Sequence, residues 1–288
     1  TGANNVAIGK SAGLLLQGAA HSNTLVGTEA GVALTTSVSN TAVGFEALST
    51  ASNFGENTAI GYRSQKVSSS GHSNTSVGHE TFLSLTTGTL NVAVGHDAGM
   101  FATTTDGSVF IGHNAAKGIT GTKLTGNNNT AIGKDAGLVL QGAAADNTLV
   151  GTLAGAQQTT GTRTAALGYK AGYNLTTGHS NVAIGWQALL TEDAHSNNVA
   201  VGASALQTQN AGAHAYNTAV GFQVGASITT GIQNTLVGAL TGDALNTGKE
   251  HVAIGYEALS TETNAHASVA IGYQALKAQN GSGAIYTL

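Results

Sequence analysis

The stretch Asn40-Thr41-Ala42-Val43-Gly44 decides the fold, because variants of it recur along the whole 288-residue chain. Its closing glycine recurs sixteen times, and eleven of the fifteen intervals are 17 residues, the other four being longer. A fixed period of this size indicates a solenoid. We therefore predict an all-β parallel β-solenoid of about 16 coils. The key glycines are Gly9, Gly27, Gly44, Gly61, Gly78, Gly95, Gly112, Gly133, Gly151, Gly168, Gly185, Gly202, Gly221, Gly238, Gly255 and Gly272.

The residues before each key glycine alternate between two faces of a short strand. The residue directly before it is Val, Ile or Leu in every copy, and the third before it is Thr or Val in fifteen copies. The residue between them is Ala in eleven copies. The larger aliphatic column, which includes Val94 and Ile184, is expected to face the core. The alanine column is expected to face outward, at Ala42, Ala59, Ala93 and Ala183 among others.

The key glycines are expected to supply bends with positive φ. The turn positions assigned on this basis are Gly44, Gly61, Gly78, Gly95, Gly185 and Gly255. A second glycine often lies seven residues earlier, which predicts two short strands per coil of about 17 residues.

The residues after the key glycine indicate one core slot per coil. Leu48 is followed three residues later by a small residue, whereas Gly31 is followed by Leu34. Since close packing tolerates neither a void nor two leucines in one slot, either position is expected to fill it. The pairs Phe82 with Leu85 and Gly155 with Gln158 break this rule and predict local repacking.

Composition narrows the function classes. Only 8% of residues are charged, the net charge is −4, and cysteine and proline are absent. No basic patch indicates nucleic-acid binding, no apolar run is long enough for a membrane span, and no disulfide can form. No catalytic motif is present, so we expect no enzyme activity, no metal and no cofactor.

Residues 1–288 are interpreted as one solenoid domain with an internal duplication, near 1–124 and 125–248, plus extra coils. Residues 9–31 and 133–155 are identical at eighteen of 23 positions. The longest insertion, around Gly118 to Asn129, is expected to form a projecting loop. Because Thr1 lies inside a repeat, we expect a fragment of a longer fibre.

Three columns could carry binding chemistry. The asparagine column, for example Asn40, Asn57 and Asn74, is interpreted as a structural ladder of stacked amides. His79, His96 and His113 could bind metal but are interpreted as a surface row. Exposed aromatic rings follow several key glycines, and they either seal a seam between associated chains or contact a glycan or another surface: Phe45, Tyr62, Tyr169, Trp186, Tyr256 and Tyr273.

The pattern N-[TS]-[AV]-[AL]-[VI]-G-x-x-A resembles the head repeats of trimeric autotransporter adhesins, the YadA-like heads, and is similar to repeats in phage tail fibres. The resemblance implies a left-handed β-roll, a homotrimer and an extracellular location. It also implies a structural or attachment segment of a fibre, with a host-surface glycan or receptor as a candidate partner.

Two other functions stay open. An ice-binding solenoid would need an exposed threonine row, and the alternation of Thr with Val in this column favours a half-buried core position instead. A purely structural filament subunit is the second alternative.

Overall fold

The protein is an all-β parallel β-solenoid with about 15 turns of about 17 residues, which confirms the predicted fold class. The computed structural model describes residues 4–50, 55–278 and 284–287, and these residues form strands and turns but no helix. The chain divides into two compact units, residues 1–146 and 147–288.

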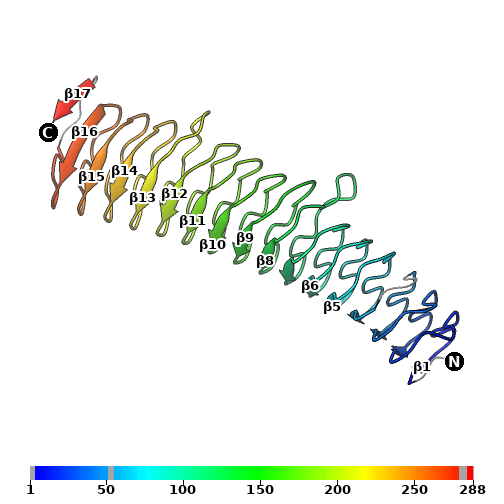
Figure 1. The fold of residues 1–288 in the computed structure, drawn as a ribbon. Coiled ribbons are helices and arrows are strands. Elements are labelled where there is room, and N and C mark those ends of the chain that lie inside the picture. The colour runs from blue at the N-terminus through cyan, green and yellow to red at the C-terminus, as the bar shows by residue number, and fades with distance from the viewer. Residues whose placement is uncertain (1–3, 51–54, 279–283, 288) are drawn as a thin grey trace. The chain divides into compact units, whose positions relative to one another are not determined.

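Each turn contributes one short strand, and successive turns stack side by side within each unit (Figure 1). The strands of the first unit are β1 Val6–Ile8, β2 Thr24–Val26, β3 Thr41–Val43, β4 Thr58–Ile60, β5 Thr75–Val77, β6 Val92–Val94, β7 Val109–Ile111 and β8 Thr130–Ile132. Those of the second are β9 Thr148–Val150, β10 Ala165–Leu167, β11 Val182–Ile184, β12 Val199–Val201, β13 Thr218–Val220, β14 Thr235–Val237, β15 Val252–Ile254, β16 His266–Ile271 and β17 Ala284–Thr287.

Neighbouring strands pair in parallel and in register with the repeat. Thr41 pairs with Thr58, Ala42 with Ala59 and Val43 with Ile60. The same register continues through the other paired turns of each unit, with an irregularity between β16 and β17. Equivalent side chains of adjacent turns therefore lie above one another, as in other parallel stacks.

The key glycines are confirmed as the turn positions. All six assigned glycines have φ between +134° and +136°. A Cβ atom on Gly44 would lie 2.4 Å from the carbonyl oxygen of Gly61 in the next turn. Glycine is therefore required for two reasons: the backbone has positive φ, and the next turn approaches closely.

The expected second strand is absent from the described turns, and its place is taken by residues with left-handed backbone. Glu46 has φ of 53° and Leu48 has φ of 49°, and equivalent residues in other turns do the same. This side still bonds to its neighbours, since the Leu48 N–H donates to the Ser64 carbonyl at 3.2 Å. Both sides of each turn are thus joined to the next turn by backbone hydrogen bonds, but only one side is extended.

The two faces of the strand are the reverse of the expectation. Ala42, Ala59, Ala93 and Ala183 are fully buried inside the roll. Val94 and Ile184 point outward and are 36% and 37% exposed. The alternation was predicted correctly, but the interior between the strand and the opposite side of the turn is narrow, so the small side chain faces inward.

The core slot is confirmed. Leu48 fills it from the fourth position after the key glycine, and Leu34 fills it from the seventh; both are fully buried. A Cβ atom on Gly31 would lie 2.7 Å from Leu34 Cδ1, so the two positions compete for the same space.

The exceptions to the slot rule repack as expected. Phe82 and Leu85 are both fully buried. Space for Phe82 comes from Gly99 in the next turn, where a Cβ atom would lie 2.6 Å from the Phe82 ring. Gln158 fills its slot with an amide whose Nε2 donates to Asn147 Oδ1 at 2.9 Å.

The longest insertion projects from the first unit, as expected. Residues 119–123 are all exposed, and the loop stands out between β7 and β8 (Figure 1). Leu124 is buried and returns the chain to the stack through parallel bridges to Ala102 and Gly142. The insertion is thereby accommodated without interrupting the pairing of β7 with β8.

Replacing a key glycine should destabilise the stack. In Gly95→Ala the new Cβ atom would lie 2.5 Å from the Gly112 carbonyl oxygen, on a residue with φ of +136°. Backbone strain of this kind costs about 1–3 kcal/mol, and the overlap adds to it. Urea denaturation should show this loss, while Gly121→Ala, which meets no heavy atom within 4 Å, should leave the free energy of unfolding unchanged. Equal stability of both variants would contradict the close stacking.

Candidate functional site

In five successive turns of the first unit, the residue after the key glycine carries a ring, and these five rings form an exposed row. Phe45 stacks on Tyr62 with a centroid distance of 5.4 Å, and Tyr62 stacks on His79 at 5.0 Å. His96 follows His79 at 4.5 Å, and His113 follows His96 at 5.3 Å. From the sequence, Phe45 and Tyr62 were interpreted separately from the histidine row. In the structure, all five rings form one continuous stack.

The second unit carries further exposed rings at the same position. Tyr256 stacks on Tyr273 at 5.6 Å. Tyr169 and Trp186 are 42% and 52% exposed, and the Lys170 ammonium lies 5.5 Å from the Tyr169 ring centre. All six candidate rings are therefore accessible, and their contact with a glycan or another surface stays a prediction.

A row of charges runs beside the rings in the first unit. Arg63 Nε lies 2.7 Å from Glu46 Oε2, and an Arg63 terminal nitrogen lies 3.6 Å from Glu80 Oε1. Lys66 Nζ also contacts Glu46 at 2.7 Å. The hydrogen bond from Lys66 is the largest effect that lowers the pKa of Glu46. Arg63 thus lies between two carboxylates, as the order of charges in the sequence indicates.

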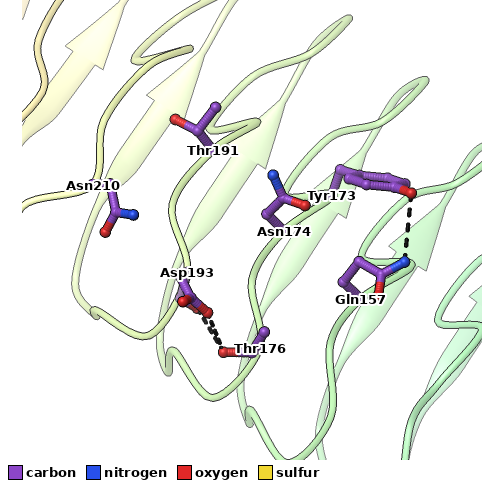
Figure 2. A pocket seen from close by; sticks show the side chains of 7 residues that line it. All are labelled: Gln157, Tyr173, Asn174, Thr176, Thr191, Asp193 and Asn210. Carbon is purple, nitrogen blue, oxygen red and sulfur yellow. Dashed lines mark hydrogen bonds between the residues drawn. The ribbon is translucent and has the colours of Figure 1, made fainter.

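A polar hollow of about 460 Å³ lies on the second unit (Figure 2). It is formed by residues five to eight positions after the key glycines, and so by the side of the turns opposite the strands. Tyr173 supplies one ring, and its hydroxyl accepts a hydrogen bond from Gln157 Nε2 at 3.4 Å. Thr176 donates to Asp193. The hollow is lined by Gln157, Tyr173, Asn174, Thr176, Thr191, Asp193 and Asn210.

The asparagine column is a buried structural ladder, as interpreted from the sequence. The backbone N–H of Asn74 donates to Asn57 Oδ1 at 3.1 Å, and that of Asn91 donates to Asn74 Oδ1 at 3.0 Å. Asn74 Nδ2 in turn donates to the Gly88 carbonyl at 2.8 Å. These side chains are almost completely buried, so they are not accessible to a ligand.

His251 takes the place of an asparagine in this ladder. Its Nε2 lies 2.7 Å from the Ala265 carbonyl oxygen, and its Nδ1 accepts the Ser268 N–H at 3.2 Å. These partners require a neutral ring with the proton on Nε2. Burial lowers the pKa of His251, which keeps the ring neutral.

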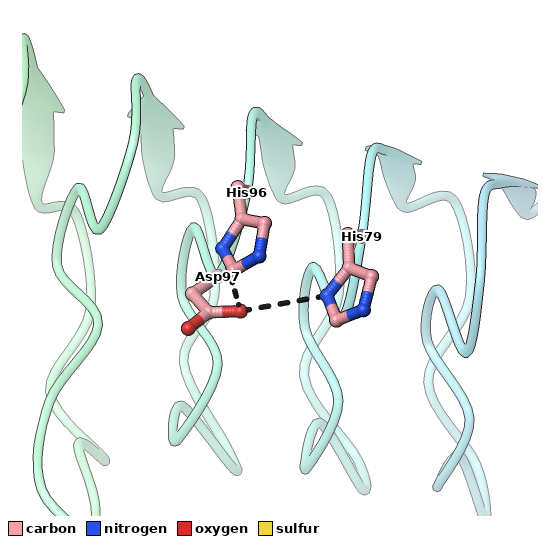
Figure 3. Close-up of side chains that lie close together, drawn as sticks. All are labelled: His79, His96 and Asp97. Atoms are coloured by element: carbon pink, nitrogen blue, oxygen red, sulfur yellow. Dashed lines mark ion pairs between the residues drawn. The ribbon is translucent and has the colours of Figure 1, made fainter.

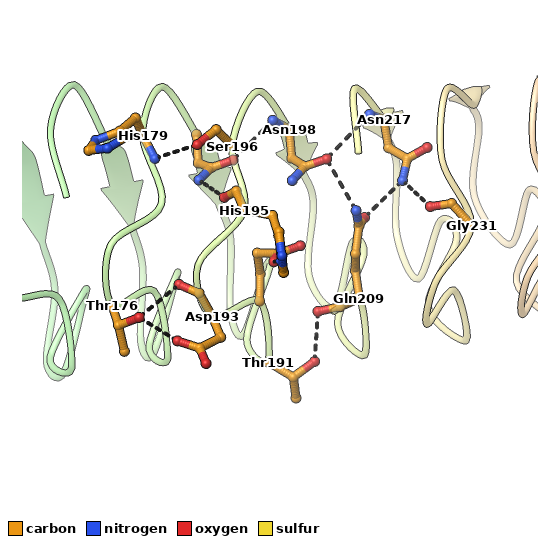
Figure 4. Close-up of polar contacts among 12 residues, drawn as sticks. Thr176, His179, Thr191, Asp193, His195, Ser196, Asn198, Gln209, Asn217 and Gly231 are labelled. Carbon is orange, nitrogen blue, oxygen red and sulfur yellow. Dashed lines mark hydrogen bonds and ion pairs between the residues drawn. The ribbon is translucent and has the colours of Figure 1, made fainter. Parts of the chain in front are cut away.

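In the second unit, polar contacts connect His195, Asn198 and Gln209 with their neighbours (Figure 4). One buried carboxylate pairs with His195. Glu192 is fully buried at a core-slot position, and its Oε1 pairs with His195 Nδ1 at 2.8 Å. Its Oε2 has no hydrogen-bond partner. Burial raises the pKa of Glu192, and the hydrogen bond with His195 opposes this shift. At the equivalent position two turns earlier, Gln158 instead donates to its ladder asparagine.

Comparison of the chain with protein-family models and with curated protein sequences gave no match. Among the described residues, the structure has no helix long and apolar enough to cross a membrane.

Glu192→Gln should stabilise the second unit at neutral pH. The new amide can donate to Asn181 as Gln158 does to Asn147, and a buried polar atom without a partner costs about 1–3 kcal/mol. Because the folded pKa is raised, the wild-type carboxyl contributes most stability below its ordinary value of 4.5 and loses it as the pH rises through the folded pKa. The gain in thermal melting should therefore shrink toward pH 4.

The exposed Glu250→Gln serves as the matched control and should change the melting temperature little at either pH. A variant less stable than the wild type at pH 7 would contradict the buried, unpaired carboxylate.

Proposed function

We propose that the chain is a segment of an extracellular homotrimeric fibre, of the kind found in bacterial surface adhesins or phage tail fibres. It would serve as shaft and as attachment surface, without catalysis. The observation that carries the proposal is an outward apolar stripe on the strand face of each unit. Its most exposed members are Ile8, Ile60, Val94, Ile111, Leu167, Ile184, Val220, Ile254 and Ile271.

The stripe favours sister copies as its occupant. Continuous exposed apolar surface usually marks an interaction site. A flat row repeating once per turn matches a partner with the same pitch, and an identical chain has that pitch. The number three rests on the resemblance of the repeat to trimeric adhesin heads. Because the alanine column is buried inside the roll, the proposed contact between sister copies lies on the outward Val/Ile column.

The polar hollow and the rings support the attachment role. A ring such as Tyr173 beside amide, hydroxyl and carboxylate groups is a suitable surface for a sugar, since it offers both stacking and hydrogen bonds. The hollow lies opposite the strands, so association through the stripe would leave it uncovered. A host-surface glycan is therefore the proposed ligand class.

Association should depend on the stripe and not on the fold. Light scattering of the wild type should give about three times the chain mass of 28.5 kDa. The variant Ile60→Lys with Val94→Lys should be monomeric with unchanged circular dichroism, because both side chains lie on the surface of the roll. The exposed Thr104→Lys should stay trimeric. A monomeric wild type at micromolar concentration would contradict the fibre proposal.

Ice binding is the second candidate, and the structure strengthens its case. The threonine column was expected at a half-buried core position, but it lies on the outer face of the strand, where Thr41 is half-buried and Thr24, Thr148 and Thr235 are exposed. Regular hydroxyl and methyl groups on a flat sheet can order water. If the face binds ice, the wild type should show thermal hysteresis that is lost in Ile60→Lys with Val94→Lys. Hysteresis from a monomer would favour this candidate over the fibre.

A further inference from the structure

Two histidines and one aspartate meet beside the ring ladder of the first unit (Figure 3). His79 and His96 follow the key glycines after β5 and β6, and Asp97 follows His96. Asp97 Oδ1 lies 3.0 Å from His96 Nδ1 and 3.8 Å from His79 Nδ1. The two rings lie on the outer surface, whereas Asp97 is only 6% exposed. Two half-exposed nitrogens therefore flank one buried carboxylate oxygen.

The two oxygens of the Asp97 carboxylate have different partners. Its Oδ2 contacts Lys117 Nζ at 2.8 Å. Its Oδ1 is buried and makes no hydrogen bond, and its neighbours are the two imidazole nitrogens, which form ion pairs with it only when the rings are protonated. A buried oxygen without a hydrogen bond is costly, so with neutral rings a cation held between the same nitrogens is a suitable partner for it.

We propose that His79 Nδ1, His96 Nδ1 and Asp97 Oδ1 bind a first-row divalent cation of the Zn²⁺ or Ni²⁺ class. Such ions bind imidazole nitrogen and carboxylate oxygen at about 2.0–2.2 Å, so ligand atoms around one ion lie about 3.0–3.5 Å apart. The observed separations of 3.0 and 3.8 Å lie near this range, and all three ligand atoms lie within 4.8 Å of one another. Mixed imidazole and carboxylate ligands favour these ions over Mg²⁺ and Ca²⁺.

Binding requires the two rings to rotate out of their parallel stack. The two imidazoles are nearly parallel, with an interplanar angle of 3°, and an ion must lie in the plane of each ring that binds it. Both side chains are about half exposed, so each ring can turn about its Cβ–Cγ bond. The remaining coordination positions face solvent and are open to water. The ion would link two successive turns and neutralise the unpaired oxygen.

Other positions of the histidine row lack this set of ligands. His113 Nδ1 lies 4.0 Å from Asp135 Oδ1, but among the described residues this pair is not part of a group of three close ligand atoms. Within the described residues, His79, His96 and Asp97 form the one group of three such side chains with ligand atoms this close. His113 is thus a matched control, because it has the same position in the repeat and similar exposure.

Titration calorimetry of the chelator-treated full chain with ZnCl₂ and with NiCl₂ at pH 7.5 tests the site. The wild type should bind one ion per chain, and MgCl₂ should give no heat. His79→Ala and His96→Ala should each weaken binding at least about tenfold, and Asp97→Asn should do so if circular dichroism shows it folded. His113→Ala should bind like the wild type. Binding should be lost at pH 5, because the imidazoles must be neutral to bind.

Three results would overturn the site. The first is no uptake by the wild type. The second is unchanged affinity in His96→Ala. The third is an equal, partial loss in all three histidine variants including His113→Ala, which would show that the row only collects ions weakly through its surface imidazoles.

Discussion

Close stacking at the key glycine is the constraint on which the structure depends. The carbonyl group of the next turn occupies the space that a side chain at the key glycine would need. A Cβ atom added to Gly44, for example, would lie 2.4 Å from the Gly61 carbonyl oxygen. This approach fixes the register of the strands and places equivalent residues directly above one another. The asparagine ladder and the ring ladder both follow from it. The side chain at one position must therefore fit against the equivalent side chains of the turns above and below it.

The narrow interior explains which residues lie inside. In most turns an alanine from the strand and one leucine-sized side chain fill the space between the strand and the opposite side of the turn, and Leu25 and Phe110, for example, replace the alanine in others. Gln158 and Gln209 occupy slot positions, are fully buried and donate to ladder asparagines, so the interior accepts polar groups where the ladder can bond them. The larger Val and Ile side chains are thereby left on the outer face. The apolar surface available for association is a consequence of the thin core.

The sequence predicts the solenoid, the period, the bends and the core slot, because each depends on spacing and size. It does not predict which strand face is inside, since Ala and Val are both apolar and the width of the interior comes from the far side of the turn. Leucine rarely adopts a left-handed backbone, so the residue type at Leu48 gives no indication of its positive φ. The sequence shows the histidine row and the neighbouring acids, but the burial of Asp97 with one unpaired oxygen appears only when the turns are stacked.

The asparagine ladder gives the second unit a direction and a weak link. Each asparagine oxygen receives the backbone N–H of the turn that follows, so a completed turn presents a row of acceptors to the next. Between Gly202 and Gly221 the interval is 19 residues, and Asn198 Nδ2, on the turn that precedes this interval, has no hydrogen-bond partner. The bond from the Asn217 N–H to Asn198 Oδ1 is also long, at 3.3 Å. When the stack is pulled along its length, we expect the second unit to open first here, between the turns that carry Asn198 and Asn217.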